Sequence, residues 1–250
     1  MTPTNATVMN TGTFDRKSLR VAATLLLAGQ LLYVVITLFH TGGEANNHAT
    51  IFAAYAASQI WTGVHIAQFA CMAIMLAGLL ALFFALDAPP GTAGWAARFG
   101  AASAVATLAL CGVVLAVDGV ALKQAANAWA SAPEAEKAAR FAVAEGMRWL
   151  EWGTRSFESF TLGLAMLLFA VAVAQAARAL RPIAYLMGLS GLAYLVQGWT
   201  GATEGFSQTH TIGIVLAEVF NAAWAVWLLV VARRMPGLEP ASLGRNSGIR

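Results

Sequence analysis

Six long apolar stretches, with most of their ionisable residues gathered at one end, constrain this chain more than any other feature of its sequence. Each is close to the roughly 20 residues that a helix needs to cross about 30 Å of hydrocarbon. The stretches cover residues 19–39, 60–86, 99–117, 150–174, 183–200 and 211–231. They predict an all-α, polytopic integral membrane protein whose fold is a six-helix transmembrane bundle.

The composition favours the same class. Hydrophobic residues make up 59% of the 250 and charged residues only 11%, whereas soluble domains are about a quarter charged. A soluble protein of this composition could not cover its core. Cys71 and Cys111 both lie in apolar stretches, where a free thiol behaves as a small hydrophobe, so no disulfide framework is expected.

The distribution of charge predicts the orientation. With the N-terminus in the cytoplasm, ten of the fifteen Lys and Arg residues lie on the inner side and nine of the twelve acids on the outer side. The positive-inside rule therefore places both termini in the cytoplasm, and we expect a multi-pass protein of a bacterial cytoplasmic membrane. Residues 1–17 and 236–250 are expected to be disordered tails on either side of a transmembrane domain, 18–235.

Two outer connections are expected to extend helices beyond the membrane, near 48–59 and 132–148. Asn47 is a candidate cap for a helix that begins at His48, and Ser131 with Glu134 has the spacing of a capping box. No proline follows either cap before the inner end of its span, so each helix either continues or breaks at a glycine. The candidate break points are Gly63, Gly146 and Gly153.

Five charged residues in the fourth segment follow one another at helical spacing and share one face: Glu145, Arg148, Glu151, Arg155 and Glu158. The outer members, 145–151, are interpreted as a solvated, self-paired surface helix. Arg155 and Glu158 lie deeper and are predicted to face the bundle interior as partners, because an ionisable group within the membrane needs one.

Other polar residues fall on the expected interior faces of the second, fifth and sixth segments. Glu218 follows His210 by eight residues, which places it about 12 Å deeper along a helix. A carboxyl group at that depth needs a cation, a network of donors or a proton. The predicted ligand-binding set is His65, Gln68, Arg155, Glu158, Gln197, Glu218 and Asn221.

A metal site is the alternative interpretation of these polar residues. All four histidines of the protein fall on its predicted outer half. The candidate ligands are His65, His210, Glu158 and Glu218. His40 and His48 form only a weak motif because two glycines lie between them, and Asp118 and Lys123 are interpreted as interfacial. No cofactor is assigned, and the segments lack the pair of deep histidines that a b-type haem requires.

Three functions remain open from the sequence. The first is binding or transport of a small polar solute, a cation or a proton, and the second is a metal-dependent membrane oxidoreductase or hydrolase. The third is a non-catalytic accessory or structural subunit whose polar residues only join helices. The expected partners are the lipid bilayer, a small polar ligand or cation, and a second copy or a partner membrane subunit; no nucleic-acid partner is expected.

Overall fold

The computed structural model describes residues 16–42, 44–88, 90–177 and 180–234, and every regular element within these ranges is helical. The elements are α1 (Arg16–Thr37), α2 (His48–Ala57), α3 (Trp61–Leu86), α4 (Thr92–Ala116), the π-helical turn η1 (Val117–Leu122), α5 (Lys123–Ala130), α6 (Glu134–Ala176), α7 (Arg181–Glu204) and α8 (Gln208–Arg234). The tails predicted at 1–17 and 236–250 fall almost wholly outside the described residues.

Five helical segments in the described part of the chain are long and apolar enough to cross a membrane, and they indicate a membrane protein. They are Lys17–Thr37, Trp61–Leu86, Thr92–Ala130, Glu134–Ala176 and Gln208–Arg234. The third of these joins α4, η1 and α5 into one continuous segment. At 24 residues α7 is long enough to cross, but its four glycines and several polar residues leave it less apolar than the other five.

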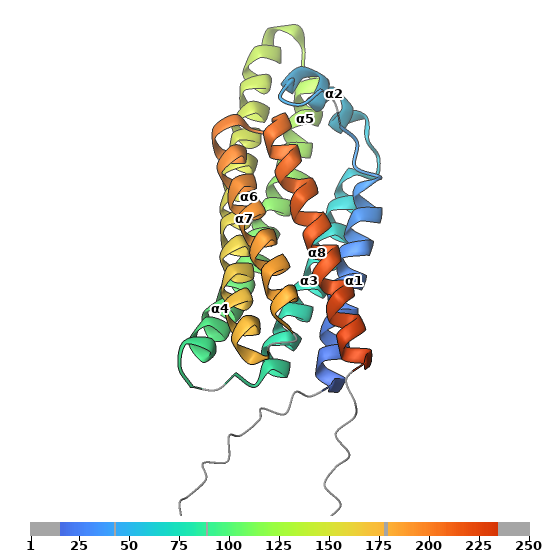
Figure 1. Ribbon diagram of the computed structural model, residues 1–250. Coiled ribbons are helices and arrows are strands. Elements are labelled where there is room, and N and C mark those ends of the chain that lie inside the picture. Colours follow the sequence, from blue (N-terminus) through green and yellow to red (C-terminus); the bar gives the residue numbers. More distant parts are fainter. Residues whose placement is uncertain (1–15, 43, 89, 178–179, 235–250) are drawn as a thin grey trace, which may run out of the picture.

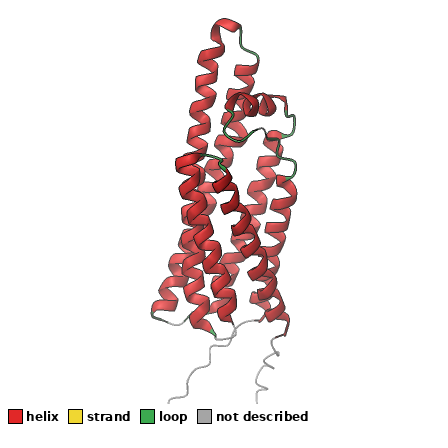
Figure 2. Ribbon diagram, turned by 45° about the horizontal axis from the view of Figure 1, so that its top comes forward, coloured by secondary structure: helices red, strands yellow, loops and turns green. Residues whose placement is uncertain are grey.

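Contacts between the long helices close a ring. Helix α1 packs against α3, α3 against α4, α4 against α6, α6 against α7, α7 against α8, and α8 returns to α1. Figure 1 shows that the first described residues of α1 and the last of α8 lie at the same end. The opposite end, called the distal end below, holds α2, α5 and the first turns of α6 (Figures 1 and 2).

The structure confirms the cap expected at Asn47, shows no break in α6 and contradicts two other expectations about the distal helices. Asn47 caps α2, and its side chain accepts a hydrogen bond from the backbone N–H of Thr50 at 3.3 Å. Helix α6 is continuous for 43 residues, about 65 Å, and so extends well beyond a 30 Å hydrocarbon layer. The helix break falls between α2 and α3 rather than at Gly63. Ser131 caps nothing, because its hydroxyl donates back to the carbonyl of Asn127.

Small residues let α6 and α7 approach closely. A Cβ atom added at Gly163 would lie 2.8 Å from the carbonyl oxygen of Gly191, and one added at Gly191 would lie 2.9 Å from the carbonyl oxygen of Gly163. Within a membrane, where association gains nothing from expelling water, such backbone contact is a main source of helix attraction. These glycines therefore hold α7 against the ring.

Candidate functional site: a polar cavity at the distal end

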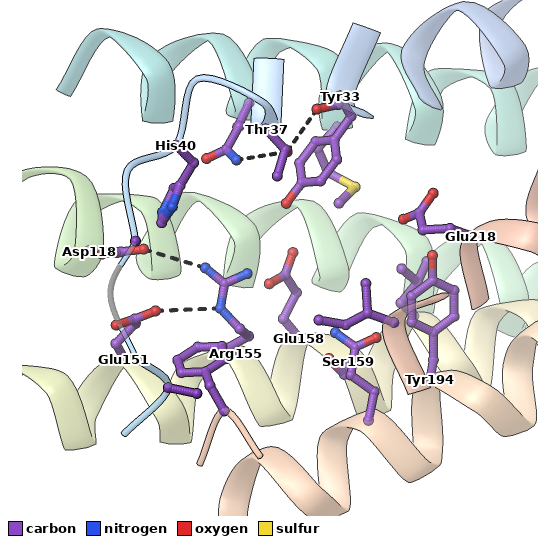
Figure 3. Close-up of a pocket in the computed structure, with 18 of the residues that line it drawn as sticks. Tyr33, Thr37, His40, Asp118, Glu151, Arg155, Glu158, Ser159, Tyr194 and Glu218 are labelled. Carbon is purple, nitrogen blue, oxygen red and sulfur yellow. Dashed lines mark hydrogen bonds and ion pairs between the residues drawn. The ribbon is translucent and has the colours of Figure 1, made fainter. Parts of the chain in front are cut away.

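A cavity of about 340 Å³ lies inside the ring toward the distal end. Its wall includes residues from α1, α2, α3, η1, α6, α7 and α8, together with the loop that follows α1. The polar side chains of the wall are Tyr33, Thr37, His40, Tyr55, Gln68, Asp118, Arg148, Glu151, Arg155, Glu158, Ser159, Tyr194, Gln197 and Glu218. Figure 3 shows many of them pointing toward one another from opposite helices.

Arg148 and Glu151 form a buried ion pair in the distal part of the cavity. Their side chains are 5% and 1% exposed, and Arg148 Nη1 lies 2.5 Å from Glu151 Oε2. Arg148 Nη1 also donates to the hydroxyl of Tyr55 at 3.0 Å, and burial raises the pKa of this phenol, which stays neutral. The prediction that residues 145–151 form a solvated surface is therefore wrong for these two side chains.

Arg155 lies between two acids that come from different helices. Its Nη2 atom is 3.6 Å from Asp118 Oδ2 on η1, and its Nε atom is 3.6 Å from Glu151 Oε1 on α6 (Figure 3). Both carboxylates are 1% exposed, so the guanidinium offsets charge that would otherwise be very costly to bury. The predicted pairing of Arg155 with Glu158 is replaced by these two ion pairs.

An aromatic ring covers the guanidinium groups. The ring centre of Phe206 lies 4.5 Å from Cζ of Arg148 and 5.8 Å from Cζ of Arg155, within the range of cation–π attraction. Asn46 fixes this segment, because its side chain accepts from the N–H of Phe206 at 3.0 Å and donates to the carbonyl of Glu204 at 2.8 Å. The loop after α1 and the connection between α7 and α8 thus close the distal side together.

The opposite end of the cavity contains carboxyl groups without a cationic partner. Among the described residues, neither Glu158 nor Glu218 lies in an ion pair. Glu218 Oε2 accepts from the side-chain amide of Gln30 at 2.9 Å, and Tyr194 lies beside Glu218 in Figure 3. Glu158 is 7% exposed and lies seven residues after Glu151 on α6, about 10 Å farther from the distal end.

Asp118, which the sequence predicts to lie at the membrane interface, is fully buried within the protein. Its Oδ2 atom lies 3.0 Å from Nε2 of His65, and its backbone carbonyl accepts from the indole N–H of Trp61 at 2.9 Å. Lys123, one turn farther along, is half-buried. Its ammonium group donates to three backbone carbonyls at the end of α2, at 2.6–3.0 Å.

Five of the seven predicted ligand-binding residues line the cavity: Gln68, Arg155, Glu158, Gln197 and Glu218. The remaining two lie outside the wall. His65 contacts Asp118 but does not itself line the cavity. Asn221 on α8 donates to the hydroxyl of Tyr194 on α7 at 2.6 Å and accepts from the indole N–H of Trp224.

The four predicted metal ligands do not come together. His210 Nδ1 bonds the carbonyl oxygen of Gln197, and within the described residues no three of His65, His210, Glu158 and Glu218 bring their donor atoms within 4.8 Å of one another. The group that does so consists of His40, His65 and Asp118.

His40, Asp118, Arg148 and Glu151 are the site residues that the sequence reasoning missed. The position of Asp118 within a helix could have been predicted. No proline lies between Val117 and Pro133, so the third helix was free to continue beyond the end of its apolar stretch. No family model, curated protein or solved structure matches this chain.

Proposed function

We propose that this protein binds a small cation in the polar cavity and moves it across the membrane. The cation is a proton, a monovalent inorganic ion or a small amine. The observation that supports this proposal is the pair of carboxyl groups, Glu158 and Glu218, which line the cavity without an ion-pair partner among the described residues.

Charge and size both favour a small cation. Arg148 and Arg155 are already engaged with Glu151 and Asp118, so the two remaining carboxyl groups need a proton or an external cation in a medium of low dielectric constant. The phenol rings that line the same cavity also suit a cation, which their π faces attract. A volume near 340 Å³ is at the small end of the roughly 300–1,000 Å³ of ligand pockets.

The proposal includes a topology of six spans with both termini in the cytoplasm of a bacterial cell. Helix α7 is the sixth span, because it packs along its length between α6 and α8, which are both apolar enough to cross. Basic residues at the end that holds the termini support the orientation. They are Lys17, Arg20, Arg98, Arg181, Arg233 and Arg234.

Flux into proteoliposomes tests the proposed activity. The probes are an internal pH-sensitive dye, Na⁺, K⁺ and labelled methylammonium. We expect the parent protein to carry at least one of these cations, and Glu158→Gln and Glu218→Gln to reduce that flux at least about tenfold while Glu44→Gln, on an exposed loop residue, keeps it. If the parent moves none of the probes faster than empty liposomes and none raises its melting temperature, the proposal is wrong and an accessory subunit becomes the better interpretation.

Cysteine labelling tests the topology separately. In a background without Cys71 and Cys111, single cysteines at positions 44 and 204 should react with an impermeant maleimide in intact cells. Cysteines at positions 92 and 240 should react only after the cells are permeabilised. The reverse pattern at both pairs would overturn the proposed orientation.

A further inference from the structure

Three potential metal ligands from three different elements meet at the distal part of the cavity. His40 follows α1, His65 lies on α3 and Asp118 lies on η1. One ligand atom from each lies within 4.8 Å of the other two, and both His65 and Asp118 are 1% exposed. The sequence separates the three residues widely, so only the packing of the ring brings them together.

The hydrogen bonds of His65 define which of its nitrogens is available. Nδ1 lies 2.8 Å from the backbone carbonyl of Trp61, and because a carbonyl only accepts, Nδ1 bears the hydrogen. Nε2 faces Asp118 Oδ2 at 3.0 Å. In a neutral imidazole this nitrogen is an acceptor, as is the carboxylate oxygen, so their contact requires either a second proton on the ring or a metal ion bound to both atoms. A backbone carbonyl that orients the other ring nitrogen is the usual arrangement around metal-binding histidines.

Asp118 provides a second, independent indication. Its Oδ1 atom is buried and accepts no hydrogen bond from the residues that the structure describes, although an unsatisfied buried carboxylate oxygen is costly. The residue lies on a π-helical turn, a distortion that is frequent at functional sites. Two hydrogen bonds hold this turn against α3, from Trp61 Nε1 to the carbonyl of Asp118 and from Thr62 Oγ1 to the carbonyl of Gly119, at 2.9 and 2.8 Å.

We propose that His40, His65 and Asp118 bind a divalent transition-metal ion, with Zn²⁺ favoured by the ligand set. Two imidazoles and one carboxylate are ligands that zinc commonly takes, and three protein ligands leave its fourth position open. His40 and Asp118 line the cavity whereas His65 does not, so the open position faces the cavity. Arg155, 3.6 Å from Asp118 Oδ2, then acts as an outer partner of the liganding carboxylate, and Glu151 offsets its charge.

Metal binding to the purified full chain tests the site. Zinc content is measured after purification without chelator, and zinc and cobalt are then titrated into the stripped protein. We expect one Zn²⁺ per chain, absorption bands of four-coordinate Co²⁺, and a loss of affinity of about a hundredfold or more in His40→Ala and Asp118→Asn. His48→Ala is the matched control, since His48 lies on α2 and pairs with Glu145 at 2.9 Å; it should bind zinc as the parent does.

His40→Ala is the informative variant. His40 is only half-buried, and its replacement leaves the buried contact of His65 with Asp118 in place. The proposal is wrong if the parent retains no stoichiometric zinc and binds none at micromolar concentration, as expected for a plain imidazolium–carboxylate ion pair. It is also wrong if His40→Ala binds as tightly as the parent, or if Glu158→Gln with Glu218→Gln abolishes binding instead. Since the readout is metal content and not flux, the result is independent of the proposed cation transport.

Discussion

Gly119→Ala is expected to destabilise the protein through one contact between η1 and α3. A Cβ atom at position 119 would lie 2.5 Å from Cβ and 2.9 Å from Cγ of His65, whereas carbon atoms in ordinary contact are about 3.5–4.0 Å apart. The nearest atom is the first of the side chain and cannot rotate away. The two backbones must therefore separate by about 1 Å, which also lengthens the 3.0 Å contact between His65 and Asp118.

Overpacking of a well-packed interior costs about 1–3 kcal/mol. For a chain of this length, each kcal/mol corresponds to about 2–4 °C in melting temperature, so we expect Gly119→Ala to melt several degrees below the parent. Thermal unfolding in detergent, followed by tryptophan fluorescence, measures the shift.

Gly112→Ala is the matched control on the same segment. Its added Cβ would meet only Cε2 of Phe69, at 3.5 Å, an ordinary contact. Replacing a helical glycine by alanine in such a place stabilises a helix by up to about 1 kcal/mol. If Gly119→Ala melts at or above the temperature of Gly112→Ala, the close approach of η1 to α3 does not hold and the reasoning is refuted.

Two further predictions concern the buried ion pair and the contact between α6 and α7. Arg148→Met is expected to lower the free energy of unfolding by about 3–5 kcal/mol, because Glu151 loses its closest cation. Replacing both Arg148 and Glu151 by Met should recover most of that loss. Denaturant titrations measure both variants, and additive losses would contradict the prediction. Gly191→Ala should cost about 1–3 kcal/mol, because the new Cβ would lie 2.9 Å from the carbonyl oxygen of Gly163. Gly188→Ala, whose nearest contact is 3.9 Å, should melt no lower than the parent, and equal melting of the two alanine variants would argue against backbone contact at this interface.

Apolar length predicted the long helices well because it depends only on neighbouring residues. The stretch 60–86 corresponds closely to α3 (Trp61–Leu86), and 211–231 lies within α8 (Gln208–Arg234). Helix ends were harder to predict. The apolar stretch 99–117 stops where η1 begins, although the helical segment runs on to Ala130, because packing against α2 and α6 supports the polar turns beyond it.

The site was only partly predictable for a related reason. Depth along a helix follows from counting residues, and it singled out Arg155, Glu158 and Glu218, which line the cavity. Partners across helices do not follow from counting. Helical spacing suggested that Arg155 pairs with Glu158, yet Arg155 lies against Asp118 from another segment, 37 positions away in the sequence.

The sequence by itself determined that this chain is helical and suited to a membrane, because hydrophobic length and the scarcity of charge are properties of composition and order. It also determined that polar groups lie toward one end of the apolar segments. Only the tertiary structure decided which of them meet. His40, His65 and Asp118 come together, and Glu158 and Glu218 have no cationic partner in the described part of the chain. The reason is that the rotation and separation of each helix depend on contacts with its neighbours in the ring, such as that of Gly119 with His65.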